Sequence, residues 1–321
     1  MHEVPSRADV HTPGTPAGAP TLAAPQPRFA RVLVVANPVA GRGQGARAAA
    51  EVARGLERAG SAVDVHLTRA RGDGRARVRC MAPDVGLVVS IGGDGTLREV
   101  LDGLVDPAVP VAVLPGGTAN VLALDLGLAR DVDGLLETVE HGREQPIDVA
   151  DVNGHLSFLV TGVGFDGRVA RALEARRRGP ITKLAYLPAV ASALRGYRPP
   201  RLSVELDGER LDETFGLVLV SNIVHYGGFL KLSGGRLDDG RWQVYLFPDA
   251  SPLALARAGL RGSLASLPAP RSCTMLSARR VRVESPEPVE VQVDGDARGT
   301  TPIELVVRER KNVLLVPPRP R

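Results

Sequence analysis

The 321-residue sequence has few aromatic residues, two cysteines and no long apolar run. Aromatic side chains make up 3% of it, too few for a surface that stacks nucleic-acid bases, so we expect no nucleic-acid partner. Cys80 and Cys273 do not have the spacing of a metal site or a disulfide framework. Because the sequence also has no bilayer-spanning run and no signal-peptide core, we expect a cytoplasmic protein.

The overall composition is that of a soluble globular protein, with 44% hydrophobic and 24% charged residues. The length predicts two domains. A net charge of +4 suits an anionic substrate or a membrane surface. Residues 1–28 are rich in proline and alanine, so they predict a disordered tail ahead of the folded part.

The most informative stretch joins an apolar run, a glycine-rich turn and an amphipathic segment. Leu87–Ile91 predicts a buried strand, and residues 92–95 contain three glycines that allow a sharp turn. Thr96 and Glu99 have the spacing of a capping box, which predicts that a helix begins here. Backbone N–H groups at such a turn attract phosphate, although many glycine turns are plain connections. Asp94 favours a functional turn over a plain connection. A carboxylate that faces phosphate repels it unless the carboxylate accepts a hydroxyl proton or meets a metal ion.

Two further apolar strands end in glycine-containing turns, at Asn37–Gly43 and Pro115–Thr118. Strands that alternate with helices predict a mostly parallel sheet, whose ligands bind at the carboxyl ends of the strands. Three turns that could converge at this edge indicate a binding site. The predicted strands span residues 32–36, 62–67, 87–91 and 109–114, and the helices 46–58, 73–80, 97–104, 119–126 and 132–140.

After Gln145 the pattern changes to short strands and tight turns, which predicts a β-sandwich-like second domain. Asp207-Gly208 predicts a hairpin turn. One helical segment, residues 168–198, interrupts the strands, and residues 313–317 could form a strand that returns to either domain. The other predicted strands span residues 148–153, 155–161, 201–206, 210–214, 215–221, 243–247, 280–284 and 289–293.

Six short motifs in this order resemble the diacylglycerol kinase catalytic-domain family, which includes bacterial lipid kinases and sphingosine kinases. They are Asn37-Pro38-x-x-Gly41, Gly92-Gly93-Asp94-Gly95-Thr96, Pro115-Gly116-Gly117-Thr118-Ala119-Asn120, Gly162-Val163-Gly164-Phe165-Asp166, Asp239-Gly240 and Val293-Asp294-Gly295. The resemblance implies an α/β nucleotide-binding domain over residues 29–145 and a β-rich lipid-substrate domain over 146–305, with the active site in a cleft between them. Residues 306–321 would form a C-terminal segment.

The resemblance also implies an ATP-dependent lipid kinase that uses Mg²⁺ and phosphorylates the hydroxyl of diacylglycerol or a related lipid. In the Arg236–Arg241 loop, the Asp239 carboxylate and the carbonyls of Arg236 and Arg241 would hold a structural Mg²⁺, although the residues alone suggest a plain Asp-Gly turn. The residues that the resemblance assigns to ATP are Asn37, Thr68, Gly92, Gly93, Asp94, Gly95, Thr96, Thr118 and Asn120.

Two positions depart from the family pattern. Asp296 stands where the family has the glutamate proposed as proton acceptor, and the resemblance implies that the shorter Asp296 is the base. Val121 stands where many members have an aspartate that supports the catalytic centre. Asp94 would therefore be the second catalytic residue and would carry more of that role, or Asp166 could.

Two other functions remain open from the sequence. An NAD kinase shares the Gly-Gly-Asp-Gly-Thr turn, and a catalytically silent lipid- or nucleotide-binding regulator would tolerate Val121 and Asp296. For the kinase, we expect a peripheral encounter with lipid at a membrane surface. A basic segment that includes Arg171, Arg176, Arg177, Arg178 and Lys183 could assist it, although most such runs are solvated helix faces. A sheet edge of the second domain could also support a homodimer.

Overall fold

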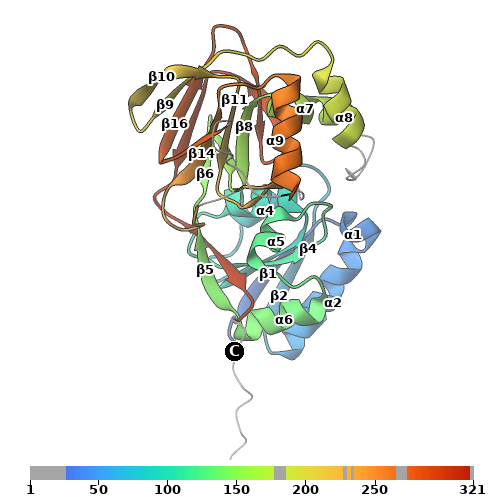
Figure 1. Cartoon of the computed structure of the whole chain (residues 1–321). Helices are drawn as coiled ribbons and strands as arrows, with labels where there is room; N and C mark the ends of the chain where they lie inside the picture. The colour runs from blue at the N-terminus through green and yellow to red at the C-terminus, as the bar shows by residue number, and fades with distance from the viewer. Residues whose placement is uncertain (1–26, 177–185, 227–229, 233–234, 265–272, 319–321) are drawn as a thin grey trace, which may run out of the picture.

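The computed structural model describes residues 27–176, 186–226, 230–232, 235–264 and 273–318. Figure 1 shows an α/β domain below and a β-rich domain above it. The predicted N-terminal tail lies almost entirely outside the described residues, and so do Arg177, Arg178 and Lys183 of the basic segment. The α/β domain joined to a β-sandwich confirms the predicted fold class.

The sheet of the first domain has the strand order β2-β1-β3-β4-β20-β5. The first five strands run parallel, and β5 pairs antiparallel with β20. The C-terminal strand β20 therefore lies inside the sheet of the first domain, although its chain arrives from the second. The strand bounds are β1 Arg31–Ala36, β2 Ala62–Leu67, β3 Leu87–Gly92, β4 Val111–Pro115, β5 Arg143–Ile147 and β20 Asn312–Val316.

Helices cover both faces of this sheet because β1, β3 and β4 bury side chains on both sides. Leu56 and Val139 of α2 and α6 pack with Val34 and Leu87 on one face. On the other face, residues of α3, α4 and α5 form a second core cluster. The helix bounds are α1 Ala40–Gly43, α2 Gly45–Arg58, α3 Asp73–Arg79, α4 Asp94–Gly103, α5 Val121–Leu126 and α6 Val132–His141.

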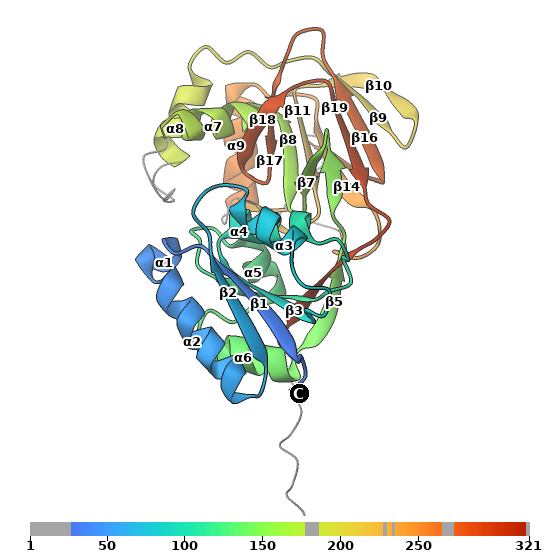
Figure 2. The same ribbon diagram turned by 180° about the vertical axis from the view of Figure 1, so that it is seen from behind.

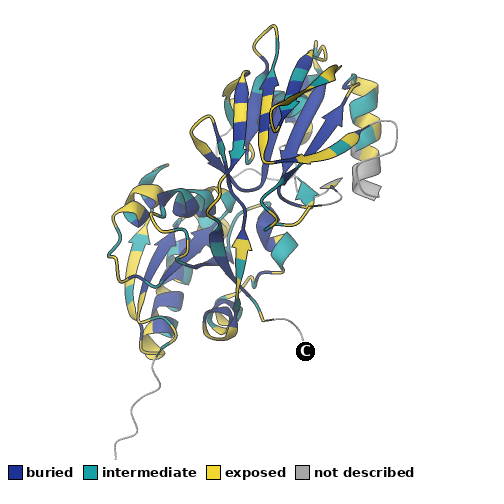
Figure 3. Ribbon diagram, turned by 90° about the vertical axis from the view of Figure 1, so that its left-hand side faces the viewer, coloured by how far each residue is buried: buried dark blue, intermediate teal, exposed yellow. Residues whose placement is uncertain are grey.

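Two six-stranded antiparallel sheets form the second domain, in the orders β10-β9-β16-β19-β6-β7 and β15-β14-β11-β8-β17-β18. Alternate residues such as Val204, Val283 and Val244 face one shared core. Figure 3 shows long stretches of the strands in dark blue, the colour of buried residues. The strand bounds are β6 Ala150–Val152, β7 His155–Ser157, β8 Val160–Gly164, β9 Leu202–Leu206, β10 Glu209–Phe215, β11 Leu217–Ser221, β14 Trp242–Phe247, β15 Thr274–Ala278, β16 Arg280–Glu284, β17 Glu290–Val293, β18 Asp296–Thr300 and β19 Ile303–Val307.

Among the described residues, three helices and a two-stranded ribbon complete this domain. The predicted helical segment contains α7 (Phe165–Ala175) and α8 (Tyr186–Leu194), whereas α9 (Pro252–Leu264) was not predicted. The ribbon pairs β12 (His225–Tyr226) with β13 (Leu230–Lys231). In the part of the chain that the structure describes, no helix is both long and apolar enough to cross a bilayer.

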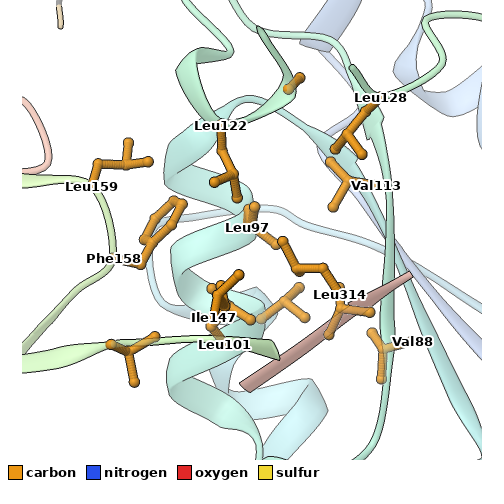
Figure 4. Packing of buried hydrophobic residues seen from close by; sticks show 14 of the residues in the cluster. Val88, Leu97, Leu101, Val113, Leu122, Leu128, Ile147, Phe158, Leu159 and Leu314 are labelled. Atoms are coloured by element: carbon orange, nitrogen blue, oxygen red, sulfur yellow. The ribbon is translucent and has the colours of Figure 1, made fainter. Parts of the chain in front are cut away.

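The two domains share apolar core across their junction. Figure 4 shows Phe158 and Leu159, from the connection between β7 and β8, beside Leu97 of α4 and Leu122 of α5. All four side chains are at most 4% exposed. Figure 2 shows the junction from behind, with α4 at the boundary between the domains. This packing fixes α4 and the turn before it against the second domain.

Two local predictions were wrong. The strand expected over residues 155–161 is interrupted at Phe158 and Leu159, whose backbone N–H groups donate to Asp294 and not to a neighbouring strand. The predicted capping box does not form, because α4 begins at Asp94, ahead of Thr96. The Glu99 carboxylate instead accepts hydrogen bonds from two backbone N–H groups of the loop before α3.

Candidate functional site

The three glycine-containing turns meet at the carboxyl ends of β1, β3 and β4. The Gly41 N–H donates to the Gly116 carbonyl at 2.8 Å, and the Gly116 N–H donates to the Gly92 carbonyl at 2.7 Å. A Cβ atom added to Gly93 would lie 3.1 Å from the Gly117 Cα. Glycine is therefore needed where the second and third turns approach each other, and the backbone amides of all three gather in one place.

The turn Gly92–Thr96, which we call the glycine turn, leads directly into α4. A Cβ atom on Gly92 would lie 2.4 Å from the Thr96 hydroxyl oxygen, whereas one on Gly95 would have no neighbour within 4 Å. The backbone at the start of α4 thus lies beside open space at Gly95. This arrangement suits the binding of an anionic group.

The Asp94 carboxylate lies in the glycine turn and faces α5. Its Oδ2 atom accepts a hydrogen bond from the Val121 N–H at 3.3 Å. Burial raises the pKa of Asp94 to about 6, although backbone N–H groups at the start of α5 partly oppose the shift. Asp94 therefore changes its charge close to neutral pH.

The turn that follows β4 is closed by the Asn120 side chain. Its Oδ1 atom accepts from the Gly117 N–H at 2.8 Å, and its Nδ2 group donates to the Gly117 carbonyl at 2.7 Å. Asn120 has a φ angle of +45°, a conformation that asparagine tolerates better than most residues. The neighbouring Thr118 is exposed. The contacts therefore make Asn120 a shape-giving residue of the turn.

The other two residues assigned to ATP lie at the ends of neighbouring strands. The Asn37 Oδ1 atom accepts from the Val39 N–H at 3.2 Å, directly after β1. The Thr68 N–H donates to the Ala36 carbonyl at 2.9 Å, directly after β2. The fold thus gathers all the residues predicted to bind ATP along one edge of the sheet, and their roles stay predictions.

Val121 fills its position with an apolar side chain that is 6% exposed and packs into the shared core. One helical turn later, the Asp125 carboxylate accepts from the Val224 N–H at 2.8 Å and pairs with His225 of the second domain. The nearest carboxylate on α5 therefore joins the two domains and lies away from Asp94.

The turn Asp294–Asp296, which we call the acidic turn, approaches α4 from the second domain. Asp294 Oδ1 accepts from the Ser157 hydroxyl at 2.9 Å and from the Leu159 and Val160 N–H groups at 3.0 and 3.1 Å. Its Oδ2 accepts from the Phe158 N–H at 3.1 Å. Burial raises the pKa of Asp294, against the charge of Arg98. Asp294 therefore pins the acidic turn to the segment that packs on α4.

Asp296, the predicted base, pairs with three arginines. Arg71 and Arg298 each place an Nη2 atom 3.2 Å from a carboxylate oxygen, and Arg98 of α4 donates to Oδ2. Burial raises the pKa of Asp296, but the arginines, Arg98 foremost, outweigh it and hold that pKa below its usual range. The carboxylate is ionised at neutral pH and holds protons weakly.

Asp166 is a further carboxylate, at the start of α7. It accepts from the Tyr226 hydroxyl and from the Gln292 side-chain amide at 2.8 Å. Burial raises the pKa of Asp166, although both donors oppose the shift. A Cβ atom on Gly162 would lie 1.8 Å from its Oδ2, so glycine is required there. Asp166 therefore belongs to a hydrogen-bonded network of the second domain.

The Arg236–Arg241 loop offers one exposed carboxylate to a cation. Asp239 Oδ1 already accepts from the Arg241 N–H at 3.0 Å. The Lys311 ammonium group donates to the Asp238 carbonyl and lies 3.7 Å from the buried Asp148 carboxylate. Among the described residues, no group of three or more His, Cys, Asp or Glu could hold a metal ion. The predicted Mg²⁺ site would use a single carboxylate, Asp239, with the carbonyls of Arg236 and Arg241, so that assignment stays a prediction.

The sequence analysis missed the arginines around Asp296 and the role of Asp294. Helical spacing offered one signal, because Arg98 lies one turn after Asp94 on α4. Arg298 is two residues from Asp296, so the i, i+2 spacing on one strand offered a second signal, whereas Arg71 is 225 residues away and offered none. The four donors to Asp294 lie 134 to 137 residues before it in the chain, so no local signal existed for them either.

Known protein families match both domains. The diacylglycerol kinase catalytic domain matches residues 31–152. The YegS C-terminal NAD kinase beta sandwich-like domain matches residues 160–315. The first match lies on the α/β domain and the second mainly on the β-rich domain, in the same order along the chain.

Similar whole proteins carry the same name. A diacylglycerol kinase of Bacillus subtilis (strain 168) is 29% identical over 284 residues, which cover 86% of this chain and 93% of the relative. One of Staphylococcus carnosus (strain TM300) is 26% identical over 280 residues, with coverage of 85% and 90%. The crystal structure of a diacylglycerol kinase from Bacillus anthracis str. Sterne covers 91% of this chain and 98% of its own, with a TM-score of 0.70 and 20% identity. Since both domains match in order, the chain belongs to the diacylglycerol kinase catalytic-domain family.

Proposed function

We propose that this protein transfers the γ-phosphoryl group of ATP, with Mg²⁺, to the hydroxyl group of diacylglycerol or a related lipid. The observation that carries the proposal is the meeting of the glycine turn and the acidic turn across the domain junction, where Arg98 of α4 contacts Asp296. One side of this junction offers backbone amides for phosphate, and the other offers carboxylates for a hydroxyl proton. The relatives named diacylglycerol kinase support the same reaction.

In this proposal the glycine turn binds the ATP phosphates through its backbone N–H groups, beside the open space at Gly95. Asn37, Thr68, Thr118 and Asn120 shape the nucleotide site around it. Asp94 is the carboxylate of the glycine turn that would face Mg²⁺ bound with ATP, and the ion would supply neutralisation of the phosphate charge. Asp296 accepts the hydroxyl proton once its arginines release it.

The test is transfer of labelled γ-phosphate from ATP, with Mg²⁺, to lipids in mixed micelles. The acceptors are diacylglycerol, monoacylglycerol, sphingosine, ceramide and an undecaprenol-type alcohol, with NAD as a soluble comparison. Asp94→Asn and Asp296→Asn are run beside the wild type. A labelled lipid that disappears in both variants supports the proposal and names the acceptor, whereas label on NAD alone would replace it with an NAD kinase.

A silent regulator is the second candidate, supported by Val121 in place of a carboxylate and by the arginines that occupy Asp296. It predicts ATP binding without transfer to any lipid. Isothermal titration with ATP, run beside the transfer assay, distinguishes the two functions.

We propose further that the lipid is met at a membrane surface. Leu187 of α8 and Leu253 of α9 are 69% and 59% exposed, and Arg171 within α7 and Arg176 directly after it are exposed. Co-sedimentation with anionic vesicles and weaker co-sedimentation with neutral ones would support this, while equal binding would contradict it. A homodimer, which light scattering in solution would detect, stays a prediction.

A further inference from the structure

Three guanidinium groups surround the Asp296 carboxylate at the domain junction. Arg71 lies in the loop after β2, Arg98 in α4 and Arg298 in β18, so the cluster draws on both domains. The Arg98 side chain is 12% exposed, that of Arg298 24% and that of Arg71 53%. Two of the three arginines are thus held largely inside the protein.

This arginine cluster has more donors than its partners can accept. Each guanidinium group carries five N–H donors, while one carboxylate has about four acceptor positions. Arg98 gives one further hydrogen bond to the Val293 carbonyl at 3.3 Å, and the buried Nε atom of Arg298 has no partner among the described residues. The surplus is unusual for buried arginines, whose N–H groups are normally satisfied.

The neighbouring carboxylates accept their hydrogen bonds from other donors. Asp294 Oδ1 accepts from the Ser157 hydroxyl and from two backbone N–H groups, and Oδ2 accepts from the Phe158 N–H. Both oxygens of Glu99 accept from the Gly72 and Gly74 N–H groups, at 2.7 and 3.1 Å. Burial lowers the pKa of Arg98, but the charges of Asp294 and Asp296 outweigh it and raise that pKa. Burial and the nearby charge of Arg98 lower the pKa of Arg298, as expected where like charges are crowded together. A further anion would relieve that crowding.

We propose that Arg98 and Arg298, assisted by Arg71, bind a phosphate group, and that Asp296 occupies this phosphate site until the group arrives. Guanidinium groups pair with phosphate through two parallel hydrogen bonds, so a tetrahedral oxyanion matches the cluster. Arg98 lies one turn beyond Asp94 on α4, which places the phosphate site next to the glycine turn. Arrival of phosphate would also release Asp296 from its ion pairs.

The source of the phosphate rests on the proposed function. It is either the γ-phosphate of ATP or the phosphate of a phospholipid headgroup, and both present the same oxyanion. The probes are therefore ATP and ADP, each with Mg²⁺, and vesicles of phosphatidylcholine with or without phosphatidate. Isothermal titration and co-sedimentation measure binding and do not require turnover.

If the phosphate site takes the γ-phosphate, Arg298→Gln weakens ATP binding about tenfold and leaves ADP binding unchanged, because charged hydrogen bonds are lost. Asp296→Asn strengthens ATP binding several-fold, because the competing carboxylate is removed. If the site takes the lipid phosphate, Arg298→Gln instead weakens binding to phosphatidate vesicles. Unchanged binding of ATP and of both kinds of vesicle would overturn the proposal.

Arg282→Gln is the matched control, since Arg282 pairs with Glu284 two residues away on β16, as Arg298 pairs with Asp296 on β18. Thermal unfolding checks that each variant folds. Should Arg298→Gln fail to fold, Arg298→Lys keeps the charge but loses the paired hydrogen bonds, so it should weaken binding less. If Arg298→Gln weakens the binding of ATP but not of ADP, and the wild type phosphorylates no lipid, the proposed function is contradicted and the phosphate site is supported.

Discussion

The glycine turn of the first domain and the acidic turn of the second each present an aspartate to the domain junction, in opposite surroundings. Asp94 is held by backbone N–H groups, and burial raises its pKa to about 6. Asp296 is held by three arginines that outweigh its burial, and its pKa is lowered. Asp94 therefore binds its proton more tightly than an ordinary aspartate, and Asp296 binds its proton more weakly. Environment, and not residue type, assigns their chemistry.

The largest expected effect is on catalysis at the glycine turn. Asp94→Asn should lower the rate of lipid phosphorylation at least ~10³-fold, about 4 kcal/mol, because the neutral amide would not balance the positive charge of Mg²⁺ beside the transferred phosphoryl group. The measurement is the transfer of labelled phosphate at saturating ATP. Asp102→Asn, on the same helix and paired with Arg75, should leave the rate nearly unchanged. Equal losses in both variants would mean that the effect is structural.

A second prediction concerns the stability of the acidic turn. Asp294→Ala should lower the free energy of unfolding by about 3 kcal/mol, because it leaves four hydrogen-bond donors without their acceptor inside the protein. Chemical denaturation measures this value. Asp151→Ala removes a carboxylate that accepts from the Gly154 N–H in an exposed turn, so its effect should be much smaller. If the two costs are alike, Asp294 does not pin the turn.

The two carboxylates should also titrate separately. NMR of aspartate labelled at the carboxyl carbon should show the Asp94 signal changing with a midpoint near pH 6. The Asp296 signal should change only below the ordinary value of 3.8. The Asn variants assign the two signals. Since the ionised form of Asp94 is required, activity should fall as the pH drops through about 6, up to about tenfold per pH unit. A shared midpoint would remove the contrast between the turns.

The smallest expected effect is a gain in stability from Asp94→Asn. The folded protein raises the pKa of Asp94, so its ionised form is disfavoured above about pH 6, and the cost disappears below the unfolded pKa of 3.8. The neutral asparagine avoids that cost, so near pH 8 the variant should be more stable by on the order of 1 kcal/mol. Thermal unfolding at high and low pH measures this difference. A gain that is independent of pH would have another origin.

Much of the fold could be predicted from the sequence because it depends on local patterns. The strand predicted at 62–67 and the helix predicted at 73–80 agree with β2 and α3 to within one residue. The Asp207-Gly208 hairpin forms, with positive φ at both residues. Apolar periodicity and glycine conformation act between near neighbours, so a single sequence records them. Each short motif is also local, and the six motifs taken in order led to the family.

Tertiary structure decided which of those residues act together. Glu99 was predicted to cap its own helix but accepts from backbone N–H groups of the loop before α3. Asp294 accepts from backbone N–H groups of a predicted strand and so interrupts it. Asp296 was predicted as the base, and residues from three separate segments bring it three guanidinium groups that the sequence analysis did not foresee. The charge state of a carboxylate depends on burial and on charges within a few ångströms. Those distances arise only when segments that are remote in the chain pack against one another, so the sequence determined the turns and the folded domains determined their chemistry.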